Sequence, residues 1–412
     1  MNSFLVCAGW IQGDPVIGEC FVDHIRGEEI ISFQYDKNWL LEHSISIDPR
    51  LVKNTIRQYP PKKNHNFGFL DDISPDRWGK RLIDRSFRRQ GLNRSVLFSD
   101  YLFGVSDVGR SGGIRLKTPD GHFIGEDASG YIPPITDLRS LETAVRAFED
   151  GDEPSESYLK DLLASGSSLG GARPKAYVKD VDGSMWVAKF PSKNDDYDVG
   201  AWEMVAHELA VKCGIQVPNA KAIKISDKGT IFLVRRFDRD ANGDRIHYAS
   251  AMNMLGEYDD SDHLSSYLDI LSCLSEISDN FQDDVKQLFE RLLFNICIGN
   301  TDDHLRNHGF VLTERGWRLS EAFDLNPSTD CAEMSLLVDY ESNDKSLNLA
   351  LSVCEYFGYS QEEAYAAAQR IATIVIDNVA VLAKRYGLNN SDIDLMAGSF
   401  TESYRFLGRG IS

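Results

Sequence analysis

A short polar stretch enclosed by two apolar runs is the feature that most constrains this chain. The apolar runs are residues 292–298 and 310–312. Between them stand an acid, Asp302, and a carboxamide, Asn307, and a second acid, Asp324, follows. Mg²⁺ takes such hard oxygen ligands together with substrate phosphates. Phosphoryl transfer uses an acid to orient the nucleophile, an asparagine on one metal ion and an aspartate on the ion that bridges the phosphates. The order of Asp302, Asn307 and Asp324 along the chain therefore predicts a phosphotransferase.

A run of small residues farther upstream predicts a cradle for phosphates. It leads from Ser165 through Gly170 and Gly171 to Lys175, and Lys189 follows. Small side chains let backbone N–H groups approach an anion closely. The run is not a Walker loop, because no Gly-Lys-Ser/Thr follows at the required spacing. It fits the strand, glycine loop and strand that cover ATP in protein kinases. Taken alone, the run also fits an ordinary tight β-turn.

Residues 198–214 predict a helix that would bring a carboxylate to Lys189. Apolar residues recur along it at helical spacing. Asp198 can cap its start and Gly214 its end. Glu203 lies one turn in, where a kinase places the glutamate that aims the phosphate-binding lysine. Taken singly, Glu203 also fits an ordinary exposed helix carboxylate; combined with the acid–asparagine–acid set, it favours a kinase.

On these residues and others, the chain resembles the HipA family of bacterial toxin kinases over nearly its whole length. The matching stretches are 168–175, 188–191, Glu203, 234–239, 301–307 and 323–324, with 69–79 and 104–113 in the amino-terminal third. The resemblance implies an α+β, two-lobed kinase-like fold. Its amino-terminal lobe would be strand-rich, with an extra small β-rich subdomain before it, and its carboxy-terminal lobe all-helical.

The resemblance also implies a function and partners. HipA proteins are serine/threonine kinases, usually encoded beside a HipB-like DNA-binding antitoxin. The known targets of the family are aminoacyl-tRNA synthetases, whose inactivation stops translation and leads to growth arrest and persistence. DNA would be reached only through the antitoxin, since a net charge of −19 argues against independent binding to nucleic acid.

The resemblance assigns roles to single residues. Asp302 would be the catalytic base, Lys189 and Glu203 the ion pair, and His304 a brace for the catalytic loop. Asn307 and Asp324 would hold Mg²⁺. ATP would be bound by the glycine loop, by Lys189 and by a hinge, which together comprise Ser168, Leu169, Gly170, Gly171, Ala172, Lys175, Lys189, Val234, Arg235 and Phe237. Arg235 departs from the acidic residue that the family often has, a change that hinge contacts made through the backbone should tolerate.

Two serines in the glycine loop predict regulation by autophosphorylation. Ser168 occupies the position of the family's autophosphorylated serine, and Ser167 lies beside it. A phosphate adds roughly −1.5 to −2 charges at neutral pH. In a loop that must cover the phosphates of ATP, like-charge repulsion would eject the loop and switch the kinase off. Serines that merely favour turn geometry are the alternative interpretation.

Composition indicates a cytoplasmic protein without a membrane segment. The seven cysteines form no Cys-x-x-Cys pair and their number is odd, as expected for mostly buried thiols in a reducing compartment. No apolar run approaches the ~20 residues that span a bilayer. A metal site at His304 and His308 is disfavoured, because no cysteine or third histidine lies nearby. A basic stretch at 62–94 predicts a solvated helix face, or a surface that touches a partner or DNA held by one.

The 412 residues predict two to three domains. We expect a HipA-like subdomain at 1–147 with a small antiparallel sheet and helices, an ATP-binding lobe at 155–240, and a helical catalytic lobe at 241–412. An acidic, turn-rich run at 149–156 predicts the linker. Strong helical patterns cover 76–104, 262–298 and 361–386.

Two other classes of function stay open. One is a small-molecule or lipid kinase, because Asp-x-His-x-x-Asn also resembles the loop of phosphoinositide kinases. The other is a co-repressor, a kinase fold that acts mainly by binding an antitoxin. The presence of every catalytic position argues against the co-repressor.

Overall fold

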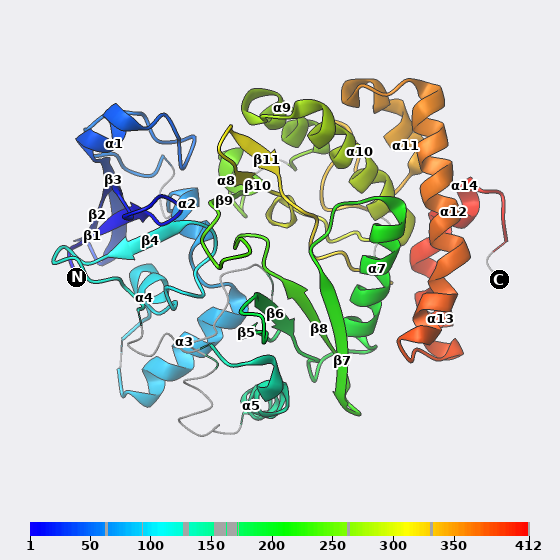
Figure 1. Ribbon diagram of the computed structural model, residues 1–412, viewed down its shortest axis with the longest axis horizontal. Helices are drawn as coiled ribbons and strands as arrows, with labels where there is room; N and C mark the ends of the chain where they lie inside the picture. Colours follow the sequence, from blue (N-terminus) through cyan, green and yellow to red (C-terminus); the bar gives the residue numbers. More distant parts are fainter. Residues whose placement is uncertain are drawn as a thin grey trace. The chain divides into compact units, whose positions relative to one another are not determined.

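The computed structural model describes residues 1–61, 65–92, 94–126, 132–151, 162, 171, 173–261, 264–329 and 333–410. Helices and strands are mixed along the chain (Figure 1). Contacts between residues divide the chain into two compact units. The first unit is Met1–Lys193 with Arg236–Asp259, and the second unit is Asn194–Arg235 with Asp260–Ser412. The three domains expected from the sequence stay a prediction.

The first unit begins with the antiparallel sheet expected at its amino terminus. The sheet has the order β3-β2-β1-β4, from strands β1 (Ser3–Ala8), β2 (Val16–Ile25), β3 (Glu28–Tyr35) and β4 (Ile114–Lys117). Arg26 and Gly27 join β2 to β3 with φ of 54° and 85°. A two-residue type I′ turn needs positive φ at both positions, and its twist matches that of the strands.

Helices pack aromatic side chains under this sheet. Asp36 caps α1 (Lys37–Glu42), and α2 (Gly68–Asp72) follows farther along. Phe33 of β3 meets Phe67 and Phe69 edge to face, at 6.4 and 5.5 Å between ring centroids. All three rings are fully buried, so they form part of the core that fixes the subdomain.

The rest of the first unit alternates helices with short strands. Asp76 starts α3 by accepting a hydrogen bond from Gly79 N at 2.7 Å. Strands β5 and β6 are antiparallel and pair Lys175 with Lys189. The helical pattern expected at 76–104 is confirmed for Arg77–Arg89 and Phe98–Phe103, while the described residues between them are not helical. The elements are α3 (Arg77–Arg89), α4 (Phe98–Phe103), η1 (Ile135–Asp137), α5 (Leu138–Asp150), β5 (Lys175–Lys179), β6 (Met185–Lys189), β9 (Tyr248–Ser250) and α8 (Ala251–Met254).

A buried ion cluster ties two distant segments of the first unit together. The Asp238 carboxylate accepts hydrogen bonds from Arg236 at 2.8 and 2.6 Å, from Arg239 at 3.0 Å and from Gly112 N at 2.7 Å. Arg236 and Arg239 also donate to the Arg110 carbonyl. The guanidinium groups thus satisfy backbone carbonyls of the 108–112 loop, most of which is buried.

The second unit opens with the predicted capped helix, α7 (Val199–Cys213). Asp198 caps its start, and Gly214 ends it with a φ of 84°. Asp198 also accepts hydrogen bonds from Thr230 N and Oγ1 at 3.0 and 2.8 Å, which joins α7 to β8 (Gly229–Arg235). A Cβ at Gly200 would lie 2.0 Å from Thr230 O, so only glycine lets α7 and β8 come this close. Strand β7 (Ala220–Ser226) pairs antiparallel with β8.

Helices make up most of the remaining second unit, as expected for 262–298 and 361–386. They are α9 (Tyr267–Ile277), α10 (Phe281–Ile298), α11 (Leu347–Ser352), η3 (Cys354–Phe357), α12 (Gln361–Arg385), α13 (Asn390–Met396), η4 (Ala397–Phe400) and α14 (Thr401–Phe406). One short hairpin, β10 (Gly309–Leu312) with β11 (Trp317–Leu319), interrupts them, so the carboxy-terminal part is mostly helical and not all-helical as expected.

Helix α12 is, in the part of the chain that the structure describes, the one helix long and apolar enough to cross a membrane. It packs against α7, α10 and α14 (Figure 1). Ile371 and Val375 on its inner face are fully buried. These contacts are typical of a core helix. Six cysteines are also free and buried, as predicted, and Cys331 lies outside the described residues.

Candidate active site

The 300–308 loop follows directly from the end of α10. Gly299 ends the helix with a φ of 68°. Asn307, in the short η2 turn (Leu305–Asn307), donates its amide hydrogen to the Asp302 carbonyl at 3.0 Å. This bond uses the amide nitrogen of Asn307 and leaves its oxygen as the group that can bind a cation. Asp302 itself is exposed, while Asn307 is buried. The loop thus presents one carboxylate to solvent and holds one carboxamide in place.

A buried network beneath the loop anchors it, and our sequence analysis missed it. Asp303 Oδ2 lies 2.8 Å from His308 Nε2, accepts a hydrogen bond from Asn295 Nδ2 at 3.0 Å, and accepts another from the Tyr267 hydroxyl. Burial alone would raise the pKa of Asp303, but His308 and these hydrogen bonds outweigh burial and lower it. A charged Asp303 therefore fixes the loop to α9 and α10.

The two histidines of the loop contact different groups. His308 is engaged with Asp303, and the carbonyl of His304 accepts a hydrogen bond from Asn307 N at 2.8 Å. Over the described residues, no group of three or more His, Cys, Asp or Glu side chains could hold a metal ion. The bracing role of His304 stays a prediction, to which its backbone bond adds support.

Asp324 lies on a segment that runs beside both ends of the 300–308 loop. Ser320 N donates to Gly309 O at 2.9 Å, and Ser328 N donates to Gly299 O at 3.0 Å. Between these two bonds, Asp324 adopts a φ of 55°, a left-handed backbone that residues other than glycine rarely adopt. Such strained residues cluster at functional sites. The strain therefore adds support for a role of Asp324 in function.

One pocket of the second unit gathers three of the predicted site residues. Glu203 of α7, Val234 of β8 and Asp324 line it together with His207 and Phe323. Its volume is about 20 Å³, which is room for about one water molecule. Glu203 is only 2% exposed. The alternative of an ordinary exposed helix carboxylate is therefore wrong for Glu203.

The hinge residues differ in their surroundings. Val234 and Arg235 end β8 and are partly buried, and Arg235 N donates to Asn219 O at 2.8 Å. Phe237 belongs to the first unit, where its ring lies 5.5 Å from that of Tyr248. Their role in binding adenine stays a prediction.

Lys175 has a protein partner that our sequence analysis did not foresee. Its ammonium lies 3.0 Å from the Asp76 carboxylate, and both side chains are buried. Trp78 Nε1 donates to the Lys175 carbonyl at 3.1 Å. Because Asp76 also caps α3, the pair joins the start of that helix to β5. Gly171 has a φ of 112°, and a Cβ there would lie 3.1 Å from Lys175 Nζ. Lys175 therefore sits under the described part of the glycine loop.

The predicted site residues divide between the two units of the chain, and some lie outside the described residues. Gly171, Lys175, Lys189 and Phe237 belong to the first unit. The second unit holds Glu203, Val234, Arg235, Asp302, His304, Asn307 and Asp324. Ser167, Ser168, Leu169, Gly170 and Ala172 lie outside the described residues. The pair of Lys189 with Glu203 stays a prediction.

Replacing Asp303 by alanine should destabilise the second unit by about 1–3 kcal/mol, because the buried Tyr267 hydroxyl and Asn295 amide lose an acceptor. Urea unfolding measures this change. Tyr267→Phe removes one hydrogen-bond donor but leaves no charged group without a partner. The loss of unfolding free energy should therefore be smaller, about 0.5–1.5 kcal/mol. Equal stability of Asp303→Ala and wild type would contradict an anchoring role.

Comparison with known proteins places the chain in a family. Residues 167–384 match the family model described as HipA-like C-terminal domain. Because this match spans more than half of the chain, the protein belongs to the HipA-like family. The predicted membership is confirmed.

Individual relatives agree with this placement. A Sinorhizobium fredii protein named "Putative kinase Y4mE" is 27% identical over 341 residues, which cover 77% of this chain and 76% of that protein. A Haemophilus influenzae protein named "Putative kinase" is 30% identical over 172 residues, 37% of this chain and 50% of that protein. HipA of Shewanella oneidensis MR-1, solved with HipB and operator DNA, superposes with a TM-score of 0.70 at 17% identity and covers 98% of both chains. The predicted HipA-like fold, with helices and strands mixed, is confirmed.

Proposed function

We propose that this protein is an ATP- and Mg²⁺-dependent serine/threonine protein kinase of the HipA type. The observation that carries the proposal is the geometry of the 300–308 loop. Asp302 is exposed, and its carbonyl accepts the Asn307 amide hydrogen at 3.0 Å, which leaves the Asn307 oxygen for a cation. The strained Asp324 lies on the segment bonded to both ends of that loop. Relatives named as kinases add support.

The donor set fits Mg²⁺ and ATP. Mg²⁺ takes one or two protein carboxylates and completes its shell with phosphates and water. Asn307 and Asp324 would be its protein ligands, and Lys189, Lys175 and the glycine loop would bind the phosphates. When bound, Mg²⁺ would neutralise charge on the transferred phosphoryl group. Asp302 would orient the substrate hydroxyl and accept its proton.

The partners and setting follow from the family. We infer that the phosphate acceptor is a serine of a protein and, from the habit of the family, that this protein is an aminoacyl-tRNA synthetase. Its phosphorylation would inhibit translation and arrest growth. A HipB-like antitoxin would bind the protein and would supply any contact with DNA, as the complex of Shewanella HipA with HipB and operator DNA suggests. A cytoplasmic location and the three predicted domains belong to the same proposal.

The direct test is phosphate transfer from labelled ATP to proteins of a lysate. We expect labelled protein that carries phosphoserine, with Asp302→Ala as the inactive control. No labelled protein, combined with turnover on a small alcohol, would favour the small-molecule kinase. Undiminished toxicity of Asp302→Ala in growing cells would favour the co-repressor.

Phosphate on Ser168 or Ser167 should inactivate the protein. The expected reason is repulsion between a phosphoserine and the phosphates of ATP in the same loop. Mass spectrometry of the protein after incubation with ATP would find the site, and activity would fall as the phosphorylated fraction rises. The Ser168→Ala and Ser167→Ala variants would show which hydroxyl matters. A fully phosphorylated and fully active preparation would contradict this prediction.

A further inference from the structure

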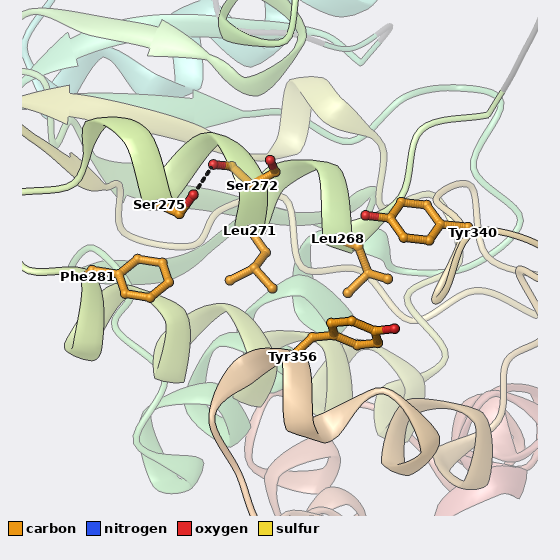
Figure 2. A pocket seen from close by; sticks show the side chains of 7 residues that line it. All are labelled: Leu268, Leu271, Ser272, Ser275, Phe281, Tyr340 and Tyr356. Atoms are coloured by element: carbon orange, nitrogen blue, oxygen red, sulfur yellow. Dashed lines mark hydrogen bonds between the residues drawn. The ribbon is translucent and has the colours of Figure 1, made fainter.

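An apolar groove opens on the surface of the second unit. Figure 2 shows Leu268 and Leu271 projecting from α9 toward Tyr356 of η3, with Phe281 of α10 and Tyr340 also on its walls. Its volume is about 260 Å³, which is below the roughly 300–1,000 Å³ of small-molecule sites. That size suits one or two side chains of a docked protein segment.

Two exposed tyrosines stand on the walls of the groove. The Tyr340 and Tyr356 side chains are 63% and 66% exposed. Tyrosine is enriched at interfaces, because its ring contributes apolar area and loses little conformational entropy on binding. Ser272 and Ser275 of α9 complete the rim, and Ser275 Oγ donates to the Ser272 carbonyl at 2.7 Å.

Exposed acidic residues stand next to several lining residues of the groove in the sequence. Carboxylates neighbour the lining residues in sequence and are exposed: Glu276 beside Ser275, Glu341 beside Tyr340, and Glu355 beside Tyr356. The sequences of α9 and η3 contain no lysine or arginine, while α10, which supplies Phe281, carries the exposed Lys286 five residues farther on. This rim complements a segment with basic residues on either side of an apolar one.

The segment that carries Tyr340 is continuous with the candidate active site. Ser335 N donates to Thr301 O at 2.8 Å, directly before Asp302, and Leu337 N donates to Ser265 O at 2.9 Å. Tyr340 follows Ser335 by five residues, so their Cα atoms lie at most about 18 Å apart. An extended peptide could therefore fill the groove and reach Asp302 within roughly six residues.

We propose that this groove binds the phosphoacceptor protein through a segment with one large apolar anchor flanked by lysine or arginine. The inference rests on the proposed function, because it takes the docked segment to be part of the kinase substrate. The anchor would pack between Leu271 and Tyr356. The basic residues would meet Glu276, Glu341 and Glu355. The groove would thus add substrate selectivity to the active site.

Peptide binding to the full chain, measured by fluorescence anisotropy without ATP, tests the groove. The probe is a short labelled peptide with one phenylalanine between arginines. Matched peptides replace the arginines by glutamates or the phenylalanine by alanine. We expect the probe to bind at least about tenfold more tightly than either matched peptide, and added salt to weaken its binding. Equal binding of all three peptides, or none by the probe, would overturn the inference.

Variants on the exposed rim locate the site without disturbing the core. Tyr356→Ala and Glu355→Lys should each weaken probe binding about fivefold or more. Tyr365→Ala and Glu362→Lys on α12, which are also exposed, serve as controls and should bind normally. Equal weakening by the controls would overturn the groove as the site. Self-association that Tyr356→Ala abolishes would also overturn it, in favour of a second copy as the occupant.

The labelled-phosphate assay separates this inference from the proposed function. The probe peptide should inhibit labelling of the lysate protein by the wild type, and Tyr356→Ala should be less sensitive to it. Labelling unaffected by the peptide would overturn the inference and leave the kinase proposal standing. Normal peptide binding with no phosphate transfer under any condition would overturn the proposed function instead.

Discussion

Replacing Asp302 by asparagine should slow phosphate transfer by about 10²- to 10⁴-fold, the usual contribution of a general base. Asparagine keeps the size of the side chain but cannot accept the proton of the substrate hydroxyl. Because Asp302 is exposed and the Asn307 bond goes to its backbone carbonyl, the fold should not change. The thermal unfolding midpoint should therefore equal that of the wild type, while kcat falls.

Asp324→Asn should remove most activity for a different reason. The amide lacks the charge that would help to hold Mg²⁺, so electrostatic stabilisation of the transferred phosphoryl group is lost. Raised Mg²⁺ should restore part of the activity of Asp324→Asn and none of that of Asp302→Asn. Asp227→Asn, in the exposed turn between β7 and β8, is the control. Activity within a few fold of wild type for both site variants would contradict the assignment.

Local signals in the sequence predicted the helices and their ends well. Helix α7 begins at Asp198 and ends at Gly214 as predicted, because capping depends on neighbours along the chain. The strands at the amino terminus also follow from their alternation and from turn residues such as Gly27. The motif between Asp302 and Asn307 is local too. Its internal hydrogen bond spans five residues, within reach of sequence reasoning.

Partners far apart in sequence could not be predicted in this way. Asp303 accepts a hydrogen bond from the Tyr267 hydroxyl, 36 residues away, and Lys175 of β5 is paired with Asp76, which caps α3. Only the fold decides which side chains meet. The only hint in the sequence of a role for the buried Asp303 is its place in the motif beside Asp302. The φ of Asp324 carries only a weak sequence signal, because aspartate adopts a left-handed backbone more often than most residues but still seldom.

Replacing Asp238 by asparagine should cost about 3–5 kcal/mol of stability, because it leaves buried guanidinium groups without their counter-charge. Arg236 and Arg239 both donate to this carboxylate, and all three side chains are buried. Burial alone would raise the pKa of Asp238, but Arg236 and Arg239 outweigh it and hold the pKa well below its usual range. The charged form is thus the one that the first unit requires.

The sign of this pKa shift sets the pH dependence of stability. A carboxyl whose pKa is lower in the folded than in the unfolded protein stabilises the fold above its unfolded pKa, about 3.9. That contribution is lost as the pH falls toward the folded pKa. Urea unfolding at neutral and acidic pH should show the Asp238→Asn deficit at neutral pH and a smaller deficit below about pH 4. Glu42→Gln, at an exposed position at the end of α1 in the same unit, should match wild type throughout. A deficit that does not change with pH would mean that packing, not charge, holds the cluster together.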